Sequence, residues 1–169
     1  MKKKPGIKVG QTLDIKNSDN VGHNTNISGQ NGFNQTIASG ASTPFVAKKE
    51  ESLPVPVRCS IHPWMKAYHI ARPDPYFAVS AADGTFTIEK LPAGVDLEFQ
   101  VWHEKGAADK GGLVGKADGL TWTAAGRFKI KIPENGEATV NAVVEPSALL
   151  FKIVAPFAPL VPIAISVFA

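Results

Sequence analysis

Short segments in which apolar and polar residues alternate run along most of the chain. Clusters of Gly, Pro, Asn and Asp separate these segments, and almost nothing has the period of a long amphipathic helix. Alternation with a period of two is typical of β-strands that bury one face. In the first half of the chain the predicted strands are Gln11–Lys16, Val21–Ile27, Gln35–Ile37, Pro44–Ala47, Leu53–Cys59 and Met65–Ile70.

The turn-forming sequence RPDP (Arg72–Pro75) predicts a boundary between two modules. A solvated loop is expected over Lys105–Gly119, which is rich in Gly, Ala, Asp and Lys. Beyond the boundary the predicted strands are Tyr76–Ser80, Thr85–Lys90, Leu97–His103, Arg127–Ile132 and Glu137–Val144, the last two closing a hairpin around PENG. We therefore expect an all-β protein with domains at 1–72 and 73–147, followed by an apolar, Pro-containing tail at 148–169.

The two ends of the sequence bear on location. The tail approaches the ~20 apolar residues that a membrane-spanning helix needs, but Lys152, Pro156, Pro159 and Pro162 interrupt it. We favour a disordered or docked tail, or an artefact of the gene end, over a membrane anchor. The basic start has no apolar stretch after it and is not an intact secretory signal. The protein either stays inside the cell or is a fragment or mis-started copy of an exported protein.

Charge and cysteine content exclude two classes of protein. The formal net charge is +3, and much of the excess lies in Lys2, Lys3, Lys4 and Lys8. No basic stripe interleaved with aromatic residues follows, so nucleic-acid binding is not expected. The single cysteine cannot form an intrachain disulfide, so a disulfide-stabilised fold is excluded as well.

The segment from Cys59 to Met65 carries the most informative chemistry. It holds the only cysteine and the only methionine besides Met1, with His62 between them. A thiolate, an imidazole and a thioether favour copper over calcium, magnesium or manganese. A strand delivers Cys59, a tight loop brings His62 to the same metal, and the next strand begins at Met65.

A further nitrogen ligand is expected from His23, which follows the turn-rich NSDNVG. The amide of the neighbouring Asn24 is placed to brace the Cys59 loop. We predict one type 1 copper ion held by His23, Cys59, His62 and Met65. Two imidazoles, a thiolate and a weak axial thioether leave no open position for substrate, which favours electron transfer over hydrolysis.

The motif C-x-x-H-P-aromatic-M and the upstream VGHN resemble the copper-binding motifs of cupredoxins of the amicyanin and plastocyanin type. This resemblance covers about Gly6–Ile70 and implies a Greek-key β-sandwich with mononuclear copper. The first strand of such a sandwich would precede Gly6, so the domain is expected to be truncated at its N-terminus. The resemblance also implies that His62, framed by Pro63 and Trp64, passes electrons to transient redox partner proteins. By the same resemblance the protein would be periplasmic or secreted.

The second half carries another resemblance. The stretch PYFAV…ADGTFTIEKLPAG…LEFQVWHE (Pro75–Glu104) is similar to carboxypeptidase regulatory-like domains. The resemblance implies a small transthyretin-like β-sandwich without catalytic residues, and a fold of this kind says little about function. Neither half is therefore expected to be an enzyme.

Several other functions are weaker interpretations of the same residues. A lone cysteine is often a buried apolar residue, and His69 and His103 are expected to be ordinary strand or surface histidines. A cysteine hydrolase would need a histidine base better placed than His62, haem attachment would need C-x-x-C-H, and structural zinc usually takes more than one cysteine. The main rival is a non-redox binding or structural β-sandwich protein of the cell envelope, with a vestigial or storage-type copper site.

Overall fold

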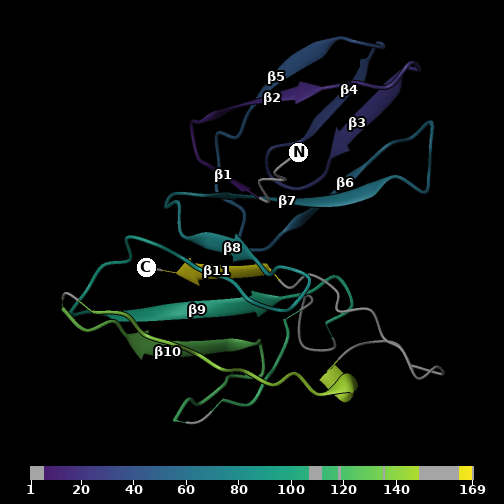
Figure 1. Ribbon diagram of the computed structural model, residues 1–169. Coiled ribbons are helices and arrows are strands. Elements are labelled where there is room, and N and C mark those ends of the chain that lie inside the picture. Colours follow the sequence, from purple (N-terminus) through teal and green to yellow (C-terminus); the bar gives the residue numbers. More distant parts are fainter. Residues whose placement is uncertain (1–5, 107–111, 118, 135, 149–163, 169) are drawn as a thin grey trace. The chain divides into compact units, whose positions relative to one another are not determined.

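The computed structural model describes residues 6–106, 112–117, 119–134, 136–148 and 164–168 (Figure 1). The chain divides into two compact units, the first ending at Pro75 and the second beginning at Tyr76. Within the described ranges the regular structure consists of strands, apart from the short 3-10 helix η2 (Pro146–Ala148). None of the helices found there has the length and apolar character needed to cross a membrane. The predicted all-β fold class is therefore confirmed.

The first unit contains every strand predicted for the first half, with ends shifted by a few residues. A five-stranded sheet has the order β1-β7-β6-β3-β4, and a two-stranded sheet pairs β2 with β5. All pairs are antiparallel except β1 with β7, which is parallel. The strands are β1 (Gly6–Lys8), β2 (Thr12–Lys16), β3 (His23–Ile27), β4 (Phe33–Ile37), β5 (Ser42–Val46), β6 (Val55–Arg58) and β7 (Lys66–Arg72).

Side chains from both sheets form one core in the first unit. Ile7, Ile27 and Ala71 of the larger sheet pack with Phe45 and Ala47 at the smaller one. The larger side chains Ile7, Ile27 and Phe45 each contribute roughly 1.5–3 kcal/mol when they are fully buried. The first unit is therefore a two-layered β-sandwich, whose strand ends can hold side chains in fixed positions.

A buried carboxylate ties two loops of this sandwich together. Glu51 is only 5% exposed, and its Oε1 accepts hydrogen bonds from the N–H groups of Gln30 (2.7 Å) and Asn31 (3.2 Å) and from Asn31 Nδ2 (3.1 Å). Next to this turn Gly29 has a φ of +102°, and a Cβ there would lie 2.7 Å from Glu51 Oε1. Only glycine fits this position without displacing the carboxylate.

The second unit is built on one four-stranded sheet with the order β10-β9-β11-β8, in which all pairs are antiparallel. Its strands are β8 (Phe77–Val79), β9 (Asp96–Trp102), β10 (Arg127–Lys131) and β11 (Ala164–Phe168). Buried apolar side chains of β9 and β10 and of the irregular segments form its core: Leu97, Phe99, Val101, Leu113, Phe128 and Ile132.

Three expectations for the second half were wrong. No strand forms at Thr85–Lys90 or at Glu137–Val144. Without the second of these strands there is no hairpin around PENG, and β10 pairs with β9 instead. The alternation in these segments correctly indicates which side chains face the core, because the partly buried Ile88 and Val140 pack against it. An extended segment can bury one face in this way without hydrogen bonding to a neighbouring strand. The expected solvated loop Lys105–Gly119 contributes Leu113, which is 1% exposed.

Much of the predicted tail at 148–169 lies outside the described residues. Of this range, Ala148 belongs to η2 and residues 164–168 form β11, between β8 and β9. The expectations for the remainder of the tail, and the domain limits themselves, stay predictions.

Candidate metal centre

The sheet register brings the start of β3 beside the end of β6. The two strands pair antiparallel, with Asn26 opposite Arg58 and Ile27 opposite Val57. Continuing this register places His23, the first residue of β3, next to the chain that leaves β6 at Cys59. The loop from β6 to β7 then carries His62 to the same point. Two segments, the start of β3 and the loop from β6 to β7, thus bring His23, Cys59 and His62 to one end of the sandwich.

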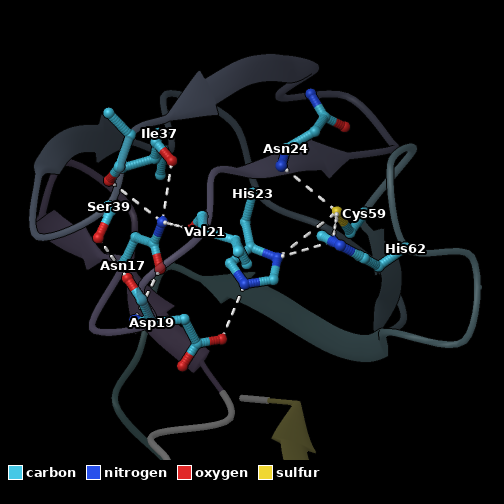
Figure 2. A network of polar contacts seen from close by, with 10 residues as sticks. Asn17, Asp19, Val21, His23, Asn24, Ile37, Ser39, Cys59 and His62 are labelled. Carbon is cyan, nitrogen blue, oxygen red and sulfur yellow. Dashed lines mark hydrogen bonds and ion pairs between the residues drawn. The ribbon is translucent and has the colours of Figure 1, made fainter.

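The donor atoms of these residues converge, as Figure 2 shows. His23 Nδ1 lies 3.1 Å from His62 Nδ1, and Cys59 Sγ lies 3.7 Å from His62 Nδ1 and 3.9 Å from His23 Nδ1. All three donors lie within 4.8 Å of one another, the geometry of a possible metal site.

These separations suit a three-coordinate metal. A trigonal ion with nitrogen ligands at about 2.0 Å and sulfur at about 2.3 Å needs donors about 3.5 Å apart for the two nitrogens and about 3.7 Å apart for nitrogen and sulfur. The structure matches these values to within about half an ångström. A soft thiolate with two imidazoles is a donor set that copper favours. The residues present therefore fit a copper ion.

The environment of Cys59 favours the thiolate, which is the form that binds metal. Burial of the side chain acts to raise its pKa. Hydrogen-bonding contacts with His23, with the backbone N–H of Asn24 and with His62 outweigh burial, and the pKa falls to about 6. Asn24 N approaches the sulfur to 3.3 Å. A thiol with this pKa is largely deprotonated near neutral pH, before any metal binds.

Asn24 also braces the cysteine loop, as the sequence predicted. Its Oδ1 accepts hydrogen bonds from the backbone N–H of Ser60 (3.2 Å) and from Ser60 Oγ (2.9 Å). Its Nδ2 donates to Asn34 Oδ1 (2.7 Å) in the neighbouring strand β4. The residue after Cys59 is thus fixed to two strands of the sheet, which limits movement of the sulfur.

The loop that carries His62 is closed at its base by the backbone of Met65. Met65 N donates to His62 O (2.9 Å), and Cys59 N donates to Met65 O (3.3 Å). These bonds place Met65 next to the donor cluster, although the position of its sulfur as a ligand stays a prediction. The outer side of the loop is apolar, with exposed Ile61, Trp64 and Met65. The ring of Trp64, 79% exposed, lies edge-on to His62 with the centroids 5.3 Å apart.

Comparison with known proteins gives one partial likeness. No protein-family model and no curated protein sequence matches this chain. Among solved structures, a purple cupredoxin from Nitrosopumilus maritimus is 29% identical over 39% of this chain and 74% of its own, with a TM-score of 0.34. The candidate metal site is therefore inferred from the donor atoms of this chain alone.

Two residues of the site were not predicted from the sequence. The carboxylate of Asp19 lies 2.8 Å from His23 Nε2, on the side of the ring that faces away from the cluster (Figure 2). Asn17 is buried and holds the turn that carries Asp19. Both lie in NSDN, whose composition predicts a turn but not the contact of that turn with His23. The pKa of His23 is raised: the contact with Cys59 raises it most, burial acts to lower it, and the carboxylate of Asp19 raises it further.

Proposed function

We propose that this chain is a type 1 copper protein that carries single electrons and catalyses no reaction. One copper ion would be held by His23, Cys59 and His62, with Met65 as a weak axial ligand. The observation that carries the proposal is the convergence of two imidazole nitrogens and a buried, low-pKa thiol at the end of a β-sandwich. Copper, when bound, supplies the one-electron redox chemistry.

The residues of the chain favour electron transfer through their rigidity. His23 begins a paired strand, and Cys59 is held by the hydrogen bonds of Asn24 and Met65. A framework of this kind restrains the donors from rearranging when the charge of the metal changes. Because redox partners must bind briefly, their interfaces are small. The apolar rim of Ile61, Trp64 and Met65 is the surface proposed to contact such a partner.

The remaining parts of the proposal rest on the sequence resemblance. We propose that the protein works in the periplasm or outside the cell, where a copper carrier would meet its redox partners. The second unit is proposed to be a transthyretin-like module that adds no chemistry of its own.

Titration of the metal-free protein with Cu(II), followed by visible absorption, tests the proposal directly. An intense blue or purple band at one equivalent is expected, because a thiolate bonded to Cu(II) in a trigonal site gives strong charge transfer. Cys59→Ala should abolish both the band and tight binding. Met65→Leu should keep copper but raise the reduction potential, because a weak donor to Cu(II) is lost. His69→Phe, which changes another histidine of the first unit, is the matched control and should bind copper normally.

The outcomes separate the main alternatives. Retention of the band and of copper affinity in Cys59→Ala would show that the ligand assignment is wrong. Copper binding to the wild type without an intense band would favour the non-redox rival with a storage-type or vestigial site.

A further inference from the structure

The carboxylate of Asp19 contacts the imidazole of His23, a proposed copper ligand, on the side of the ring away from Cys59 and His62. Asp19 Oδ2 lies 2.8 Å from His23 Nε2, while His23 Nδ1 faces Cys59 and His62 (Figure 2). The His23 side chain is 12% exposed and that of Asp19 is 59% exposed. Nε2 of the ring therefore faces the carboxylate, and Nδ1 faces the donor cluster.

The turn that carries Asp19 is held from both sides. Asn17, 7% exposed, accepts a hydrogen bond from Asp19 N at its Oδ1 (3.0 Å), and its Nδ2 donates to the carbonyls of Val21 (2.8 Å) and Ile37 (3.0 Å). Ser39 Oγ donates to the carbonyl of Asp19 (2.7 Å). The aspartate backbone is thus tied to its own turn and to the turn that follows β4. An aspartate on a mobile surface loop would make no such set of contacts.

This arrangement selects one form of the His23 ring. A carboxylate only accepts hydrogen bonds, so it holds the ring proton on Nε2. Nδ1 then keeps its lone pair, which is the state that a metal ligand requires. The competing partners at Nδ1 are His62 Nδ1 at 3.1 Å and Cys59 Sγ at 3.9 Å, and both contacts are longer than the 2.8 Å between Nε2 and the carboxylate.

We propose that Asp19 is a positioning residue for the copper centre: it fixes His23 in the tautomer with Nδ1 free and lowers the reduction potential of the bound copper. The inference rests on the proposed function. A negative charge behind an imidazole ligand makes the ring a stronger donor. Stronger donation stabilises Cu(II) more than Cu(I), because Cu(II) carries the larger charge.

The expected size of the effect follows from the exposure of Asp19. Removing an outer hydrogen-bond partner of a metal ligand typically costs 10–100-fold in metal affinity. Water screens a carboxylate that is 59% exposed, so we expect about tenfold, the lower end of this range. If Cu(II) binding weakens about tenfold more than Cu(I) binding, the potential rises by about 59 mV, the value of one decade for a one-electron couple.

The first experiment needs no metal. Two-dimensional ¹⁵N NMR of the metal-free full-length chain, at a pH where the ring is neutral, reports which nitrogen of His23 carries the proton. The wild type is expected to show protonated Nε2, and Asp19→Ala should shift the ring toward the other tautomer or a mixture. Asp14→Ala is the matched control, because it removes another half-exposed carboxylate of the same unit and should leave His23 unchanged.

The second experiment measures the reduction potential of the copper-loaded chain. Asp19→Asn, which keeps the size of the side chain, should raise the potential by about 59 mV, with Asp14→Asn near the wild-type value. Ser39→Ala frees one side of the turn and should change the potential in the same direction by a smaller amount. Should Asp19→Ala fail to fold, Asp19→Asn and Ser39→Ala carry both comparisons.

The results distinguish this inference from the proposed function. If the wild type binds no copper, the proposed function fails, while the tautomer of His23 still tests the role of Asp19. An unprotonated Nε2 in the metal-free wild type, or a His23 tautomer that is the same in wild type and Asp19→Ala, would overturn the inference. So would a normal potential in Asp19→Asn in a protein that binds copper with an intense band.

Discussion

The buried carboxylate of Glu51 offers a quantitative test of how the first unit is held together. Glu51→Ala removes the acceptor for three N–H donors of Gln30 and Asn31. A hydrogen bond to a charged group contributes about 1.5–3 kcal/mol. The three are not additive, because the Gln30–Asn31 turn lies at the surface and its donors regain water when the carboxylate is removed. We therefore expect a loss of about 3 kcal/mol in the unfolding free energy of this unit.

Amide hydrogen exchange measures this loss within the first unit alone. A decrease of about 3 kcal/mol corresponds to a roughly 100-fold faster exchange of amides that open only on global unfolding. The slowest amides of β3 and β7 are the appropriate probes, because both strands contribute side chains to the core of this unit. Asp14→Ala, at an exposed strand position, serves as the control and should change stability by no more than about 0.5 kcal/mol.

The result that would refute this reasoning is simple to recognise. If Glu51→Ala exchanged no faster than Asp14→Ala, the loops would be held by the packing of their neighbours. Glu51→Gln adds a graded comparison, since it keeps an acceptor oxygen but loses the charge. It should lie between the wild type and the alanine variant.

Two further predictions concern docking and pH. Trp64→Glu should slow electron exchange with a partner about tenfold, or about 1.4 kcal/mol, with little change in the visible spectrum. Stopped-flow measurements test this, with Val46→Glu as the control. An unchanged rate in Trp64→Glu would show that the partner binds elsewhere. Burial lowers the pKa of His69 in the folded protein, although the charge of Glu51 acts to raise it. As the pH falls below about 6.5, His69 therefore takes up a proton in the unfolded chain before it does so in the folded protein. Stability should therefore decrease below that pH, and urea unfolding of His69→Phe should show a weaker decrease; equal slopes would contradict this.

The approach of Cys59 to His62 could be predicted because their spacing is local, whereas their role as copper ligands stays a prediction. Cys59 and His62 lie on one short loop, and His23 was recognised from its turn and its neighbour Asn24. Asp19 was missed because its role depends on how the turn closes, which the buried side chain of Asn17 determines through contacts with the turn after β4. The alternation of apolar and polar residues does not show how a turn is held by distant backbone groups.

The strands of the first unit were predictable for a similar reason, and those of the second unit less so. In β2 the partly buried Leu13 and Ile15 alternate with exposed neighbours, and a partner strand completes the ladder. β1 was missed because its three residues gain their order from parallel pairing with β7. Leu113 was missed because a single leucine among glycines has no period, although its N–H donates to Val101 O and its side chain is buried.

The position of β11 has a consequence for the order in which the protein is assembled during synthesis. β8 and β9 leave the ribosome long before residues 164–168, yet β11 pairs with both of them. Until that segment has been translated, the facing edges of β8 and β9 lack their strand partner, whereas the sheets of the first unit can already close. Contacts between such distant segments also slow folding. The nascent chain would thus complete the unit that holds the His23, Cys59 and His62 cluster first, while the other unit still has open strand edges that a chaperone could protect.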